Sequence, residues 1–138
     1  MILYAFTDGA SRGNPGESGF GIVVKDDRGD TVLTLNGYIG RTTNNIAEYT
    51  ALLKLLERMR SVECSRMIVH SDSELMVKQL NGFYRVRNKG LKRYHARFQE
   101  LKKILPFDIH IRHIGREENK DADRLANEAI DTRISPSG

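Results

Sequence analysis

The sequence predicts an α/β fold in which helices pack on a mixed β-sheet. Short apolar runs, rich in β-branched and aromatic residues and separated by turn residues, occupy residues 2–40. Beyond them, apolar residues recur every three or four positions, as in amphipathic helices. Short strand-like runs lie between these helical segments, and this order favours a sheet covered by helices.

The first part of the predicted sheet comes from residues 2–40. Residues 2–7 (ILYAFT) predict a buried strand that stops at Asp8, and residues 9–18, rich in Gly, Asn, Pro and Ser, predict a loop. Residues 19–27 and 31–40 flank the turn sequence DRGD and predict a hairpin of two antiparallel strands.

Helices and strands then alternate along the chain. The spacing of apolar residues predicts helices over residues 46–60, 73–80, 91–105 and 122–130. Between them, residues 67–69 predict a short buried strand that ends just before Asp72. Residues 107–111, in which apolar and polar side chains alternate, predict a half-exposed strand. Pro106 separates this strand from the preceding helix.

The length and composition indicate one domain. The chain has 138 residues, 39% of them hydrophobic and 29% charged, as in an ordinary globular protein. We expect residues 1–133 to form this domain and residues 134–138 to be a C-terminal tail. A single cysteine argues against a disulfide-stapled secreted scaffold, and no apolar run is long enough to cross a bilayer. Because the N-terminus also lacks a signal-peptide core, we expect a cytoplasmic monomer without membrane contacts.

Positive charge is concentrated in residues 85–103, which carry eight Lys or Arg and one acid. Such a segment on a protein with a net charge of only +4 suggests a polyanionic partner such as nucleic acid. The alternative is an ordinary solvated helix face.

Four acids lie at the ends of predicted elements. Asp8 and Asp72 each follow a strand, and carboxyl ends of neighbouring parallel strands meet at one edge of a sheet. Glu48 and Asp123 lie near the starts of two helices that can face the same edge. Converging carboxylates either shift their pKa values or bind hard cations, and a set of oxygen ligands favours Mg²⁺ or Mn²⁺ over zinc. Taken singly, each acid could instead cap a helix or open a turn.

Four segments resemble the successive motifs of type 1 ribonucleases H, in order and in spacing. They are FTDGASRGNPGESGFG, RTTNNIAEYTAL, HSDSELMVKQL and REENKDADRLANEA. The resemblance covers nearly the whole chain. It implies a five-stranded mixed sheet, with three antiparallel strands followed by two parallel strands and helices on both faces.

The resemblance also implies catalytic and metal-ligating roles for Asp8, Glu48, Asp72 and Asp123, which would hold two Mg²⁺ ions, with Mn²⁺ as a substitute. Asp121 is a rival for the last place. Substrate contacts are implied for a further set of residues, namely Gly9, Ser11, Asn14, Arg41, Thr43, Asn44, Asn45 and Glu74. His113 occupies the position of a proton shuttle or product-release histidine, although the loop that follows it departs from the family pattern, and Arg116 is the alternative.

The implied function is an endonuclease that cuts the RNA strand of RNA–DNA hybrids and leaves 5′-phosphate and 3′-hydroxyl ends. Two paired metal ions can activate water and neutralise the departing oxygen in such a reaction. Two alternatives stay open at this point: a nuclease that also cuts RNA duplexes, and a module that binds hybrids without cutting them.

Overall fold

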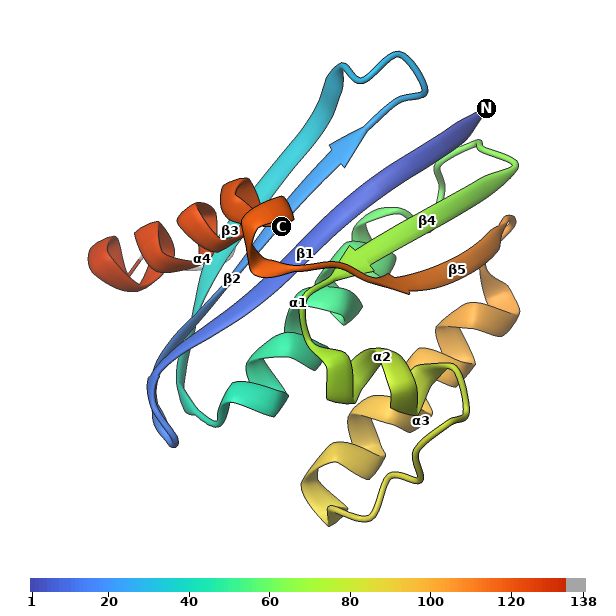
Figure 1. The fold of residues 1–138 in the computed structure, drawn as a ribbon. Coiled ribbons are helices and arrows are strands. Elements are labelled where there is room, and N and C mark those ends of the chain that lie inside the picture. The colour runs from blue at the N-terminus through green and yellow to red at the C-terminus, as the bar shows by residue number, and fades with distance from the viewer. Residues whose placement is uncertain (134–138) are drawn as a thin grey trace.

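In residues 1–133, which the computed structural model describes, five strands form one sheet in the order β3-β2-β1-β4-β5 (Figure 1). The strands are β1 (Ile2–Gly13), β2 (Gly16–Lys25), β3 (Thr31–Thr42), β4 (Arg66–Ser71) and β5 (Asp108–His113). β1, β2 and β3 pair antiparallel, whereas β4 pairs parallel with both β1 and β5. The predicted α/β class and the mixed sheet are confirmed. The predicted tail, residues 134–138, lies outside the described residues.

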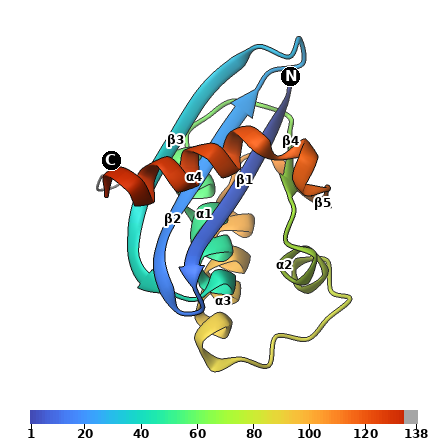
Figure 2. The same ribbon diagram turned by 60° about the vertical axis from the view of Figure 1, so that its left-hand side comes forward.

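Helices cover both faces of the sheet, as the resemblance implies. The four α-helices of the described residues are α1 (Asn44–Arg58), α2 (Glu74–Leu80), α3 (Lys89–Ile104) and α4 (Lys120–Thr132). Figure 2 shows α4 crossing one face over β1 and β2, while α1 and α3 lie together on the other. A short 3₁₀ turn, η1 (Arg116–Glu118), connects β5 to α4. None of the described helices has the length and apolar character needed to cross a membrane.

The main core lies between the sheet and α1. Leu3 and Ala5 of β1, Val69 of β4, and Leu52 and Leu56 of α1 are all buried in it. Phe98 and Leu101 of α3 extend the core on the far side of α1. Burial of such apolar surface drives the folding of a domain of this size, and here it holds α1 against β1.

The predicted loop over residues 9–18 is wrong. β1 and β2 stay paired from Tyr4 opposite Lys25 to Gly13 opposite Gly16, so this segment forms a long hairpin. Several glycines of the hairpin reflect close packing of helices on the sheet: Gly9 lies against the α1 backbone, and Gly19 and Gly21 of β2 lie against α4. A Cβ at Gly21 would lie 2.1 Å from the carbonyl oxygen of Ala122, and one at Gly19 would lie 2.6 Å from that of Ala126. α4 can therefore rest directly on the β2 backbone.

The remaining element boundaries differ from the prediction by a few residues. α1 begins at Asn44, and Thr43 caps it, because the Thr43 hydroxyl accepts a hydrogen bond from the Ile46 amide at 3.3 Å. Glu48 consequently lies in the second turn of α1 and does not take part in a capping box. Similarly, Ser73 caps α2, so Asp72 is not a helix cap. Both acids are therefore free of the capping roles that the sequence left open for them.

Candidate active site

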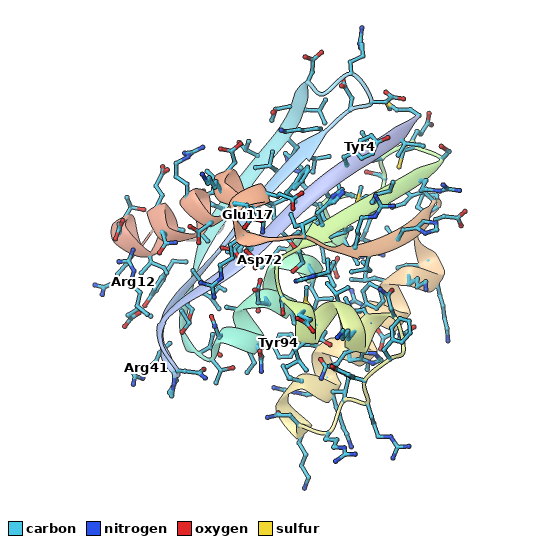
Figure 3. All side chains as sticks on the ribbon, in the orientation of Figure 1. Tyr4, Arg12, Arg41, Asp72, Tyr94 and Glu117 are labelled. Atoms are coloured by element: carbon cyan, nitrogen blue, oxygen red, sulfur yellow. The ribbon has the colours of Figure 1, made fainter. Side chains whose placement is uncertain are left out.

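Asp8 and Asp72 lie side by side where the parallel pairing of β1 and β4 ends. The last paired residues are Thr7 and Ser71, and each acid follows directly. Although β1 continues to Gly13 in its pairing with β2, the predicted juxtaposition of the two acids is confirmed. Figure 3 shows Asp72 at the carboxyl end of β4, toward the middle of the molecule.

Glu48 reaches the same place from α1. The amide of Gly9 donates a 2.8 Å hydrogen bond to Oε1 of Glu48. α1 can come this close because Gly9 has no side chain: a Cβ there would lie 2.2 Å from the carbonyl carbon of Ala47. Asp8, Glu48 and Asp72 each offer a carboxylate oxygen, and these oxygens lie within 4.8 Å of one another, which is a grouping that could hold a metal ion.

A cavity of about 310 Å³ opens over these acids. Asp123, in the first turn of α4, lines it together with Asp8, Glu48 and Asp72. Its rival Asp121 lines a different hollow on the other side of the α4 N-terminus and lies 4.0 Å from the Arg124 guanidinium. The structure therefore brings Asp123, and not Asp121, into the acidic cavity.

The buried acids of this cavity disfavour one another's ionised forms. Burial raises the pKa of the Asp8 carboxyl, and repulsion from Glu48, Asp72 and Asp123 raises it further. Burial also raises the pKa of Glu48, as does the nearby Asp72, whereas the Gly9 amide and the Arg116 guanidinium lower it. Asp8 is thus the carboxylate on which the other three converge. A bound divalent cation would offset this repulsion, so the donor set fits a hard metal ion.

The residues for which substrate contacts were predicted fall into two groups. Gly9, Ser11 and Asn44 line the acidic cavity. Asn14 lies next to this group, since its Oδ1 accepts a hydrogen bond from the Asn44 amide at 3.1 Å. Asn45 is exposed in the first turn of α1, and Thr43 serves as the helix cap.

Arg41 and Glu74 lie outside the lining of the cavity. Arg41 is exposed near the end of β3, where it points away from the sheet (Figure 3). Glu74, at the start of α2, forms an exposed ion pair with Lys78 at 2.7 Å.

The structure separates the two candidates for an assisting residue. Arg116, in the 3₁₀ turn, lines the acidic cavity. His113 ends β5, is exposed and is not part of that lining. The sequence did not single out Asn119, which is buried beside the acids with its Nδ2 3.5 Å from Oδ2 of Asp72.

Comparisons with known proteins bear on this site. The family described as reverse transcriptase-like matches residues 6–129. A ribonuclease H of Alkalilimnicola ehrlichii is 36% identical over 148 residues, which cover 94% of this chain and 94% of that protein. The chain belongs to the type 1 ribonuclease H family. A ribonuclease HI of Halobacterium salinarum is 41% identical over 130 residues, which cover 94% of this chain.

The type 1 ribonuclease H fold is also found among solved structures. LC11-RNase H1, in a crystal structure with an RNA/DNA hybrid, superposes with a TM-score of 0.90 at 41% identity and covers 94% of this chain and 97% of that one. Some relatives in sequence are longer. The chain spans 64% of the Halobacterium protein and 36% of a bifunctional protein of Mycobacterium tuberculosis that is 38% identical to it.

Proposed function

We propose that this protein is an endoribonuclease that cleaves the RNA strand of RNA–DNA hybrids by metal-dependent hydrolysis and leaves 5′-phosphate and 3′-hydroxyl ends. The observation that carries the proposal is the meeting of Asp8, Glu48 and Asp72 within 4.8 Å, in a cavity that Asp123 also lines. Membership of the ribonuclease H family and similarity to a relative solved with a hybrid support the choice of substrate.

In this proposal the four acids hold two Mg²⁺ ions, with Mn²⁺ as a substitute. When bound, the ions supply the charge that lowers the pKa of an attacking water and neutralises the departing 3′-oxygen. Asp8 lies at the centre of the set, because repulsion from each of the other three acids acts on it. The Gly9 amide keeps Glu48 in the cavity and favours its ionised form, which is the form that binds a cation.

Recognition of the RNA strand is assigned to the polar groups along one rim of the cavity. Gly9, Ser11 and Asn44 line the cavity, and Asn14 and Asn45 lie next to them. Backbone amides and asparagine side chains can approach the wide minor groove of a hybrid, where the 2′-hydroxyl distinguishes RNA from DNA. Glu74 would extend this contact at the start of α2.

The DNA strand would be held where β3 joins α1. Arg41 lies near the end of β3 and Thr43 joins β3 to α1, and Arg41 is exposed there to meet a phosphate. The exposed cations at the start of α3 would continue this contact along the duplex.

We assign the assisting role to Arg116 in preference to His113, because Arg116 lines the acidic cavity. A guanidinium stays protonated at neutral pH, so Arg116 would bind the scissile phosphate or its product rather than shuttle a proton. Arg116→Gln should therefore lower kcat more than His113→Gln does in the same hybrid-cleavage assay.

Residues 1–133 would carry this activity as one domain. We further propose that it acts in the cytoplasm, where hybrids formed during nucleic-acid synthesis would be accessible to it.

A substrate panel tests the proposal. Labelled RNA–DNA hybrid, RNA duplex, DNA duplex and single strands are incubated with the protein in Mg²⁺, in Mn²⁺ and in chelator. We expect cleavage of the hybrid's RNA strand only when a metal is present, with 5′-phosphate ends on the products. Cleavage of the RNA duplex at a comparable rate would broaden the substrate class. Binding of the hybrid without cleavage in either metal would overturn the proposal in favour of a binding module.

A further inference from the structure

Asn119 connects three of the four acids, although it is not itself an acid and does not line the acidic cavity. It precedes α4 and is only 1% exposed. Its side-chain Nδ2 donates a 2.9 Å hydrogen bond to the carbonyl of Thr7, the residue before Asp8, and lies 3.5 Å from Oδ2 of Asp72. Its own carbonyl accepts a 3.1 Å hydrogen bond from the amide of Asp123.

Helix capping does not explain the orientation of this side chain. An asparagine at the N-cap normally uses Oδ1 to accept an amide of the first helical turn. Asn119 makes no such bond, and its buried Oδ1 has no hydrogen-bond partner within residues 1–133. Rotating the amide by half a turn would set Oδ1 against the Thr7 carbonyl, so that two acceptors would face each other. The observed orientation therefore serves the two donor contacts at the cost of an unpaired oxygen.

We propose that Asn119 is a positioning residue that fixes the Asp72 carboxylate next to Asp8 and fixes the main chain of Asp123 relative to both. Repulsion within the cluster pushes the Asp72 carboxylate away from Asp8. The Asn119 amide opposes this movement, because it is anchored on the β1 backbone and presents its second N–H toward Asp72. The inference rests on the proposed function of the four acids and adds a residue that prepares them for metal.

Two substitutions of Asn119 and one matched control test the inference. Asn119→Ala removes the donors, and Asn119→Leu removes them while nearly keeping the volume, so that no large cavity is left. Asn36→Ala is the control, since Asn36 Nδ2 donates a 2.8 Å hydrogen bond to the Leu125 carbonyl and thereby holds α4 to β3 without touching an acid.

The readouts are Mg²⁺ affinity by isothermal titration calorimetry, and kcat and KM for hybrid cleavage. We expect both Asn119 variants to bind Mg²⁺ about tenfold more weakly and to lose kcat by a similar factor, with KM nearly unchanged. Asn36→Ala should melt at a lower temperature but bind Mg²⁺ like the wild type.

Unchanged Mg²⁺ affinity in Asn119→Leu, or an equal loss in Asn36→Ala, would show that Asn119 only docks α4, and the inference would fall. Failure of both Asn119 variants to fold, with Asn36→Ala folded, would overturn it in the same way. The proposed function is judged separately: a wild-type protein that binds Mg²⁺ in an Asn119-dependent manner but cuts no hybrid would refute the function and leave the positioning role.

Discussion

The Gly9 amide and the Glu48 carboxylate are joined by a 2.8 Å hydrogen bond between residues 39 positions apart. This bond fixes the second turn of α1 against β1, one residue beyond Asp8. It also supplies a donor to a carboxylate that burial would otherwise favour in its neutral form. The bond requires a glycine, because the α1 backbone occupies the space that a Cβ would need.

Gly9→Ala should therefore damage both the fold and the site. The added Cβ would lie 2.2 to 2.4 Å from backbone atoms of Ala47 and Glu48, which cannot move without shifting α1. We expect a loss of about 3 kcal/mol of unfolding free energy and strongly reduced cleavage. Chemical denaturation measures the first and the hybrid assay the second. Gly90→Ala is the control. A Cβ at Gly90 would have the Asn88 side chain as its nearest neighbour, at 3.1 Å, so this variant should change the unfolding free energy by less than about 1 kcal/mol.

The metal-free protein should become less stable as the pH rises from about 4 through the neutral range. Burial and mutual repulsion raise the pKa values of Asp8 and Glu48 above those of the unfolded chain, so the folded state binds more protons over this range. Rising pH then favours unfolding, by at most about 1.4 kcal/mol per pH unit for each group.

Melting temperatures in chelator between pH 5 and pH 8 measure this slope. Asp8→Asn should flatten it and melt at or above the wild-type temperature at pH 8, and Mg²⁺ should raise the melting temperature of the wild type only. A wild-type melting temperature in chelator that rises with pH would contradict the repulsion that we infer among these acids.

Asp123 and Asp121 offer a comparison within one helical turn. Asp123 lines the acidic cavity, whereas Asp121 lies in another hollow. Asp123→Asn should reduce kcat by about tenfold or more, and Asp121→Asn should leave it within about twofold of the wild type. Both side chains are exposed, so neither substitution should alter the melting temperature appreciably. The opposite ranking in steady-state kinetics would move the fourth acid to Asp121.

The basic residues at the start of α3 should bind the duplex without taking part in the chemistry. Lys92 and Arg93 are exposed, whereas the preceding residue, Leu91, is buried. The two charged side chains are therefore free to contact phosphates. The double variant Lys92→Gln with Arg93→Gln should raise KM several-fold at low salt and leave kcat nearly unchanged. The slope of log affinity against log salt concentration should become shallower by up to about 0.9 for each phosphate contact that is lost.

The control variant, Lys102→Gln with Lys103→Gln, removes two charges from the other end of α3. Equal effects of the two double variants on KM and on this slope would reject a localised binding surface.

The parts of the site that follow from local patterns were predictable from the sequence. Asp8 and Asp72 could be placed at one edge of a sheet, because each follows a predicted strand and the chain between the two strands is long enough for a crossover. The choice of Asp123 over Asp121 came from the family motif, and the cavity lining agrees with it.

Features that depend on contacts between distant segments were not predictable. Residues 9–18 have the composition of a loop, yet they pair as strands. Gly9 there allows the close approach of α1, and Gly13 and Gly16 pack against backbone of the same hairpin. Asn119 lies directly before a helix and has the sequence signature of an N-cap. Its contacts with Thr7 and Asp72 join distant parts of the sequence and depend on how the segment between β5 and α4 folds back over β1 and β4. The Thr43 cap, which starts α1 at Asn44, places Glu48 in the second turn, where it bonds the Gly9 amide beside the acids instead of capping α1.

Cleavage of an RNA–DNA hybrid by Asp8→Asn at saturating Mg²⁺ tests the central claim most directly. The claim is that the four acids hold the metal that cuts the RNA strand, with Asp8 at their centre. A neutral amide at this position would not supply the negative charge that holds the cations, so the account predicts a loss of about a thousandfold or more in the cleavage rate, with the protein still folded. A folded Asp8→Asn protein that keeps more than about a tenth of the wild-type rate would contradict the account.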